Sequence, residues 1–265
     1  MKHEILAHLP TDYPWKEHFH YYPTLDSTNE TLRRLAKQGA PHGTVIAAGH
    51  QTNGHGRRGR SFQSPEGMGI YLSILLRPKC TPKELMHLTC ATAVAMCNAI
   101  EAAAGFRPGI KWTNDLVYEK RKLGGILTEL GFTPKGEVSY AIIGIGINCL
   151  QASADFPPEI RDIAGSLSMV TERPISISHV ASAMMDALHQ MDKMLLSGKP
   201  GIMDSYRRDC ITLGQYISLV RGSEIRHGTA IELDEDGALL VRFSDGHTEV
   251  INSGEVSIRG MYGYV

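Results

Sequence analysis

The sequence has few of the features that mark a secreted, membrane-bound or polyanion-binding protein. Five cysteines among 265 residues form no CxxC pair and no Cys/His ligand spacing, which favours reduced thiols in the cytoplasm over disulfides or structural zinc. No signal-peptide core opens the chain, and its apolar runs end before the roughly 18 residues of a membrane span. A net charge of −1 excludes a strongly basic surface for nucleic acid or membrane. These absences predict a soluble cytoplasmic protein that folds without disulfides.

A loop without any apolar side chain runs from His50 to Arg60. It interleaves three glycines with three arginines, Gly54, Gly56, Gly59, Arg57, Arg58 and Arg60. The glycines permit close approach of the backbone to a ligand, and the clustered arginines would repel one another without an anion. The pattern also matches G-x-G-x-x-G of dinucleotide-binding proteins, but a strand follows where that motif requires a helix. We therefore predict an anion-binding loop, with an ordinary solvated basic loop as the alternative.

Hydrophobic patterning predicts a mixed sheet covered by helices. Strands are expected over residues 19–22, 44–48, 70–76 and 138–148 and in three segments within 110–130. Helices are expected to start at the S-x-x-E pattern of Ser27 to Glu30 and at Thr81 to Glu84, and to cover 157–164, 176–196 and 202–208. Residues 1–18 are expected to be irregular. Gly144 and Gly146 share one face of the central strand and leave space there.

The composition changes near residue 213. Five short alternating stretches between residues 216 and 258 are joined by turns of the Asp-Gly and Arg-Gly kind, which predicts a small β-barrel. The predicted organisation is a catalytic domain over 1–212 and a barrel over 213–265.

Five motifs occur in a fixed order before this barrel. They are Ser27-Thr28-Asn29, the glycine-arginine loop, Lys111-Trp112-Thr113-Asn114-Asp115, Lys122-Leu123-Gly124-Gly125-Ile126-Leu127 and Gly144-Ile145-Gly146-Ile147-Asn148. With them the chain resembles the biotin protein ligases, or biotin-[acetyl-CoA-carboxylase] ligases, over residues 20 to 260. The resemblance implies an α+β fold, a mixed sheet with packed helices of the class II synthetase and biotin-lipoyl ligase type, followed by an SH3-like domain.

The resemblance also implies a reaction. Members of this family join biotin to the α-phosphate of ATP, in the presence of Mg²⁺, and pass the biotinyl group from biotinyl-5'-AMP to a lysine of a biotin carboxyl carrier protein domain. A lipoate or octanoate ligase or transferase of the same fold is the alternative substrate class. A nucleic-acid-binding module that uses the basic loop and the barrel is the alternative of a different kind, disfavoured by the near-neutral charge.

Residue roles follow from the matched motifs. Lys122 is expected between the carboxylate and the α-phosphate, Arg57 and Arg58 over the phosphates, and Asp115 beside the acceptor lysine, which it orients or deprotonates. The biotin site is assigned to Ser27, Thr28, Asn29, Gln51, Gly54, His55, Lys122, Gly125, Gly144 and Gly146. The ATP and adenylate site is assigned to Arg57, Arg58, Arg60, Phe62, Trp112, Asn114 and Asn148, and no residues are assigned to a metal.

Four positions depart from the family pattern, namely His55, Phe62, Thr113 and Gly124, where Arg, Trp, Pro and Ala are common. Phe62 keeps an aromatic cover, and Gly124 is expected only to enlarge the space. His55 removes a permanent charge from the loop, so we expect loop ordering to depend on pH. The chain leaves no room for an N-terminal DNA-binding domain, so no operator binding is expected, and family members occur as monomers or homodimers.

Overall fold

The apolar stretch at residues 138–148 forms strand β7 (Val138–Asn148), the middle strand of a seven-stranded sheet. The strand order is β1-β2-β3-β7-β6-β5-β4, with β1 and β2 parallel and the other neighbours antiparallel. The remaining strands are β1 (Phe19–Leu25), β2 (Thr44–Gln51), β3 (Gly69–Leu76), β4 (Gly109–Lys111), β5 (Asp115–Tyr118) and β6 (Arg121–Phe132). This computed structural model describes residues 1–221, 224–252 and 257–260, except for the side chains of Arg58, Arg221, Glu224 and residues 257–260.

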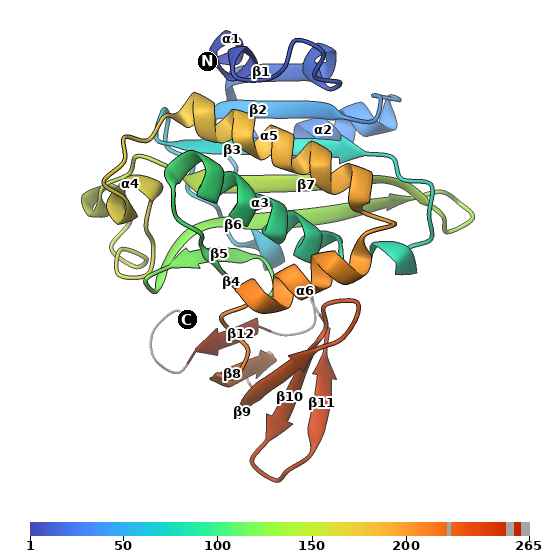
Figure 1. Ribbon diagram of the computed structural model, residues 1–265, viewed down its shortest axis with the longest axis vertical. Coiled ribbons are helices and arrows are strands. Elements are labelled where there is room, and N and C mark those ends of the chain that lie inside the picture. Colours follow the sequence, from blue (N-terminus) through green and yellow to red (C-terminus); the bar gives the residue numbers. More distant parts are fainter. Residues whose placement is uncertain (222–223, 253–256, 261–265) are drawn as a thin grey trace.

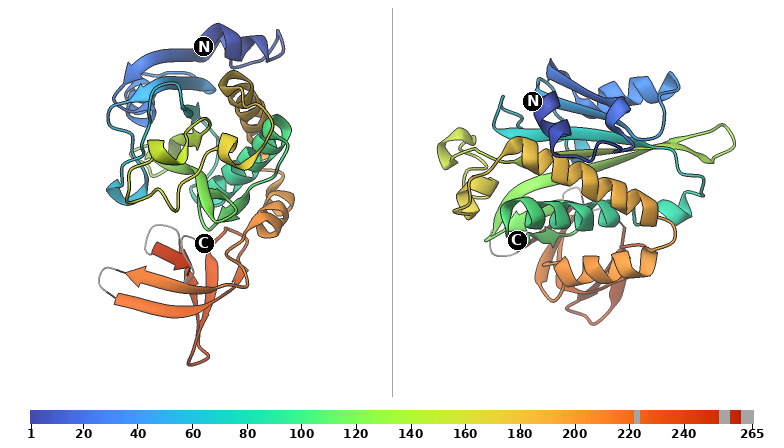
Figure 2. Two further views of the ribbon diagram at one scale, coloured as in Figure 1. Left: turned by 90° about the vertical axis from the view of Figure 1, so that its left-hand side faces the viewer. Right: turned by 45° about the horizontal axis from the view of Figure 1, so that its top comes forward.

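Helices cover both faces of this sheet, which explains why its central strands are apolar on both sides (Figures 1 and 2). α3 (Leu88–Ala104) and α5 (Ile177–Met194) pack together across one face, where the main core lies. α2 (Thr28–Lys37) packs on the opposite face. The apolar side of α2 belongs to a second cluster of Leu32, Ala36, Ile46, Leu75 and Ile142. The α2 N-terminus is thereby fixed over β2, β3 and β7.

The shorter elements connect these layers. They are α1 (Lys2–Ala7), α4 (Leu167–Val170), α6 (Lys199–Asp209) and the 3-10 turns η1 (Lys16–His18), η2 (Arg57–Gly59), η3 (Lys83–Leu85) and η4 (Ser153–Asp155). The helical stretch Lys83–Ala104 has the length and composition of a membrane-spanning helix, but 72% of its apolar window is buried inside the molecule. Burial of this kind is expected of a core helix.

A second, five-stranded antiparallel sheet follows α6, in the order β11-β10-β9-β8-β12. Its strands are β8 (Tyr216–Arg221), β9 (Glu224–Leu233), β10 (Leu239–Phe243), β11 (Thr248–Ile251) and β12 (Ser257–Gly260). Val256, the first residue of the predicted last strand, lies outside the described residues. The division near residue 213 stays a prediction.

Two predictions of local secondary structure were wrong. Residues 1–18 contain a helix, α1, and bury Ile5, Leu9, Tyr13 and Trp15. Residues 157–164 form turns instead of a helix. This segment is drawn to the sheet edge, where Lys122 N donates to Ile163 O at 2.7 Å and Gly165 N donates to Lys122 O at 2.9 Å.

The predicted capping box at Ser27 is also wrong, because partners outside the helix replace it. Ser27 makes no side-chain cap. Asp26 Oδ1 accepts from Ser27 N at 2.8 Å, and Gln51 Oε1 accepts from Thr28 N at 2.8 Å. At Thr81 the reciprocal bonds with Glu84 do form, but they cap the short turn η3, and the α-helix begins only at Leu88.

Candidate active site

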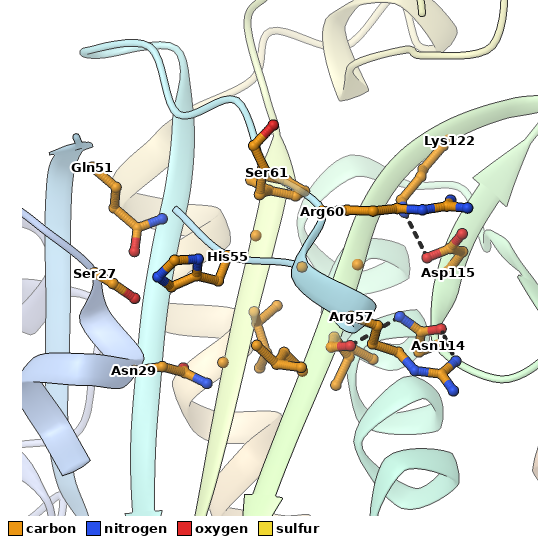
Figure 3. Close-up of a pocket in the computed structure, with 18 of the residues that line it drawn as sticks. Ser27, Asn29, Gln51, His55, Arg57, Arg60, Ser61, Asn114, Asp115 and Lys122 are labelled. Atoms are coloured by element: carbon orange, nitrogen blue, oxygen red, sulfur yellow. Dashed lines mark hydrogen bonds and ion pairs between the residues drawn. The ribbon is translucent and has the colours of Figure 1, made fainter. Parts of the chain in front are cut away.

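One cavity of about 520 Å³ gathers most of the predicted site residues (Figure 3). The predicted residues on its wall are Ser27, Thr28, Asn29, Gln51, His55, Arg57, Arg60, Phe62, Trp112, Asn114, Asp115, Lys122, Gly125, Gly144 and Gly146. They come from the start of α2, the loop after β2, the β4–β5 turn, the start of β6 and the middle of β7. Segments far apart in the sequence thus form one continuous wall.

Amide and hydroxyl groups surround one end of the cavity. Gln51 Oε1 accepts from both the backbone N and the Oγ1 of Thr28, at 2.8 and 3.1 Å. Gln51 Nε2 donates to Ser64 Oγ at 3.1 Å. Ser27, Asn29, Gln51 and His55 lie together at this end in Figure 3. The arrangement suits a buried ligand group that has both N-H donors and a carbonyl acceptor.

A lysine–aspartate pair occupies the other end. Lys122 Nζ lies 2.7 Å from Asp115 Oδ1, and both side chains remain partly exposed to the cavity. Gly125 lies beneath the pair, because a Cβ atom there would be 3.4 Å from Lys122 Cε and 3.5 Å from Asp115 Oδ1. The bonds of Lys122 to residues 163 and 165 fix its backbone. The pair therefore has a defined position at the edge of the sheet.

The glycine-arginine loop folds over the space between these two ends (Figure 3). It is closed by Phe62 N donating to Gly54 O at 2.9 Å and Gly56 N donating to Arg60 O at 2.6 Å. Arg57 Nη1 donates to Asn114 Oδ1 at 2.8 Å, which joins the loop to the β4–β5 turn. The Arg58 side chain lies outside the described residues, so its predicted role stays a prediction.

Two aromatic residues close the cavity wall. Phe62 lies on Gly146, where a Cβ atom would be 2.5 Å from its ring, and stacks edge-on against Tyr71. Burial raises the pKa of Tyr71, whose neutral hydroxyl donates to Pro65 O at 3.0 Å. Trp112 is buried, and its Nε1 donates to Gly237 O at 2.8 Å in the turn between β9 and β10. The second sheet thus supports one wall of the cavity.

The structure does not bring two predicted residues to the cavity wall. Asn148 Nδ2 donates to Gly165 O at 2.9 Å, so the residue anchors the segment after β7, and its role beside an adenylate stays a prediction. Gly54 lies behind the wall, where a Cβ atom would be 2.7 Å from Phe62 O. The expectation for Gly124 was also wrong, since a Cβ atom there would be 2.5 Å from Gly146 O and the glycine permits close approach of β6 and β7.

Several contributing residues were not predicted. Lys111 is buried, lines the cavity and lies within a quoted motif, which was the available signal. Ser73 and Glu129 contact the polar end from inside the sheet, and no local pattern distinguishes them from ordinary strand residues. Among the described residues, no group of three His, Cys, Asp or Glu side chains could hold a metal ion.

Fold and site together define a class of protein: a mixed sheet and a small C-terminal sheet around a cavity with a polar end and a lysine–aspartate end. Residues 21–148 match the biotin/lipoate A/B protein ligase family, and residues 212–259 match the biotin protein ligase C-terminal domain. The chain therefore belongs to the biotin protein ligase family. The predicted fold class and the prediction of an enzyme of this family are confirmed.

The chain is similar to known relatives and to solved structures over most of its length. The bifunctional ligase/repressor BirA of Bacillus spizizenii is 34% identical over 89% of this chain and 73% of its own length. The biotin-[acetyl-CoA-carboxylase] ligase of Mycobacterium tuberculosis is 27% identical over 87% of this chain and 85% of its own. The structure of biotin protein ligase from Aquifex aeolicus in complex with biotin and ATP has a TM-score of 0.77 and 29% identity, covering 92% of this chain and 99% of that one.

Proposed function

We propose that the protein is a cytoplasmic ATP-dependent ligase that activates biotin as biotinyl-5'-AMP and transfers it to a lysine of a biotin carboxyl carrier protein domain. The observation that carries the proposal is the single cavity with a polar end around Gln51 and a lysine–aspartate end, spanned by the arginine loop. A ligand with a ureido ring at one end and a carboxylate at the other matches this division.

The first step joins two anions. A carboxylate oxygen of biotin attacks the α-phosphorus of ATP, the bond to the pyrophosphate oxygen breaks, and biotinyl-5'-AMP forms. Lys122 lies where its ammonium group can screen both anions, and Arg57 and Arg60 supply further positive charge from the loop. Mg²⁺ would accompany the phosphates of ATP, because Asp115 and Glu159 are the only carboxylates on the described cavity wall.

The second step consumes the mixed anhydride. The neutral amine of the acceptor lysine attacks the biotinyl carbonyl, an amide forms, and AMP leaves. In this proposal Asp115 accepts the proton of that amine once Lys122 turns toward the phosphate, a role supported by the position of its carboxylate beside Lys122 on the cavity wall. Phe62 and the arginine loop cover the cavity and keep water from hydrolysing the adenylate.

Acid preference tests this proposal against a lipoate or octanoate ligase. Purified protein is incubated with ATP, Mg²⁺ and either biotin, lipoate or octanoate, and pyrophosphate release and acyl-adenylate are followed by mass spectrometry. Biotin alone is expected to react, and an added apo carrier domain is expected to gain a biotinyl group. Turnover of lipoate or octanoate in place of biotin would overturn the substrate assignment.

A pair of lysine variants tests the site in the same assay. Lys122→Ala is expected to lower kcat/KM for biotin by about two to four orders of magnitude, because a charge aimed at the reacting groups is lost. Lys135→Ala removes an exposed lysine from the turn between β6 and β7 and is the matched control. Equal activity of both variants would refute the role of Lys122.

A further inference from the structure

The carboxamide of Asn29 is held by a partly buried network that the proposed reaction does not use. Asn29 Nδ2 donates to Glu129 Oε2 at 2.8 Å, and Ser73 Oγ donates to Asn29 Oδ1 at 2.5 Å. Ser73 is fully buried, and Arg33 pairs with the other oxygen of Glu129. The network thus consists of Asn29, Ser73, Glu129 and Arg33.

The chemistry of these groups allows one orientation of the Asn29 amide. An ionised carboxylate only accepts hydrogen bonds, so the amide side of Asn29 that faces Glu129 must be the NH₂ group. The oxygen then faces Ser73 Oγ at 2.5 Å, whose one hydroxyl proton is shared between Asn29 Oδ1 and Thr28 Oγ1, 2.7 Å away. The contact with Glu129 therefore determines the orientation of the amide. The reversed amide would place two acceptors together at Glu129, at the cost of a lost, charge-assisted hydrogen bond.

The sheet is shaped to admit this arrangement. Ser73 on β3 and Gly144 on β7 are register partners, and Glu129 lies on β6 two residues beyond Leu127, the β6 partner of Gly144. A Cβ atom at Gly144 would be 2.1 Å from Asn29 Oδ1, so only glycine leaves room for the carboxamide. The amide therefore lies across three neighbouring strands, and side chains of these strands determine which side carries its oxygen and which its NH₂ group.

The Gln51 amide is fixed by a similar argument. Thr28 N requires an acceptor and finds Gln51 Oε1, while Ser64 Oγ gives its proton to Phe62 O and so accepts from Gln51 Nε2. The NH₂ groups of Asn29 and Gln51 each use one N-H in these hydrogen bonds and have a second N-H for a ligand. Figure 3 shows the amide nitrogen of Asn29 directed into the cavity.

We propose that Glu129 and Ser73 are positioning residues that hold the Asn29 amide with its N-H toward the cavity, so that the polar end selects a ligand carbonyl and rejects a donor in its place. This inference rests on the proposed function, because it takes the ureido carbonyl of biotin as the group recognised. Glu129 and Ser73 act through Asn29 and touch no reacting atom.

Biotin and 2-iminobiotin distinguish the two amide orientations. Iminobiotin carries a protonated guanidine at neutral pH, so it presents an N-H donor where biotin presents a carbonyl oxygen. The KM of biotin and the inhibition constant of iminobiotin against biotin turnover are measured for each variant at pH 7. Their ratio does not depend on the fraction of active protein.

Glu129→Gln supplies either a donor or an acceptor to Asn29 and frees the amide to turn over. We expect the preference for biotin over iminobiotin to fall about tenfold, mainly through the KM of biotin, with kcat little changed. Ser73→Ala is expected to shift the ratio in the same direction. Glu30→Gln is the matched control, because Glu30 also pairs with Arg33 but Asn29 bonds only Glu129 and Ser73 in the described chain.

Each outcome decides between the claims. A preference in Glu129→Gln equal to that of the wild type and of Glu30→Gln would overturn the positioning role and leave a structural ion pair. Exclusion of iminobiotin by every variant as strongly as by the wild type would overturn it as well. Absence of biotin turnover by the wild type would instead refute the proposed function.

Discussion

Lys122 and Asp115 are the residues whose chemistry depends most directly on each other. Their 2.7 Å contact places an ammonium and a carboxylate together on the wall of the cavity. We predict that Asp115→Asn lowers kcat for transfer to the carrier domain by about 10²-fold, the range expected for loss of a general base. Single-turnover transfer from preformed adenylate measures this step. A variant that forms adenylate slowly but transfers normally would contradict the assignment.

His55 is the loop position where this sequence has an imidazole in place of the arginine that is common in the family. It lies at the polar end of the cavity with Ser27 and Gln51, and the loss of a permanent charge there makes pH the variable to test. We predict that biotin affinity changes between pH 5.5 and 8 in the wild type and becomes flat in His55→Arg. Calorimetry at several pH values measures it. A pH-independent affinity in the wild type would sink the idea.

Strand β7 positions the polar end through its glycines. In Gly144→Ala the new methyl group would overlap the Asn29 carboxamide, so Asn29 must leave its place over the sheet. We predict that the KM of biotin rises about 10-fold to 100-fold, while the KM of ATP stays within twofold. Gly201→Ala in α6 is the control, because a Cβ atom there meets nothing within 4 Å. Equal KM values for the two variants would contradict this account.

The elements of the main sheet could be read from the sequence, whereas their ends often could not. Alternating and continuous apolar stretches specify strands such as β3 and β7 because the signal is local. At Ser27 the S-x-x-E box does not form, because the adjacent Asp26 accepts from Ser27 N and Glu30 pairs with Arg33. The helix expected at 157–164 was replaced by pairing with Lys122. In the first case a competing local partner outweighs the predicted cap, and in the second a distant partner outweighs the local preference.

In the site, too, residues with a local sequence signal were predicted, whereas residues that depend on contacts between distant segments were not. Motif residues such as Lys122 and Gln51 were found because they lie in short, recognisable stretches. Ser73 and Glu129 were missed because their importance arises only when β3, β6 and β7 lie side by side beneath Asn29. Asn148 shows the converse, since a motif residue also holds the backbone of Gly165 and its position off the cavity wall could not be foreseen from the motif.

The end of α6 is joined to the start of β4 by a buried aspartate. Burial opposes the charge of Asp209, but hydrogen bonds from Arg107 and Arg208 outweigh it and hold the pKa of Asp209 below its usual range. The resulting stability is complete above about pH 4 and is lost as the pH falls further. We predict that Asp209→Asn lowers the free energy of unfolding at pH 7 by about 1–3 kcal/mol and weakens its acid dependence. Urea titrations from pH 3 to 7 measure both, with exposed Asp204→Asn as control.

The two sheets of the molecule meet next to the proposed ATP site. Trp112 lines the cavity, and its indole N-H donates to Gly237 O in the β9–β10 turn. Thr212 Oγ1, just before the second sheet, accepts from Trp112 N at 2.9 Å. A movement of the second sheet would therefore be transmitted to the cavity wall through Trp112.

Trp112→Phe tests this connection across the whole molecule. The variant keeps an aromatic wall but leaves Gly237 O without its donor, so we predict a loss of about 1–2 kcal/mol in the free energy of unfolding. Because the indole hydrogen bond to the second sheet is lost, the KM of ATP is expected to rise several-fold while that of biotin stays unchanged. Trp15→Phe, a substitution at the other tryptophan, also buried but away from the cavity, should lose stability without changing either KM. If both variants leave the KM of ATP unaltered, the second sheet supports the fold without tuning the site.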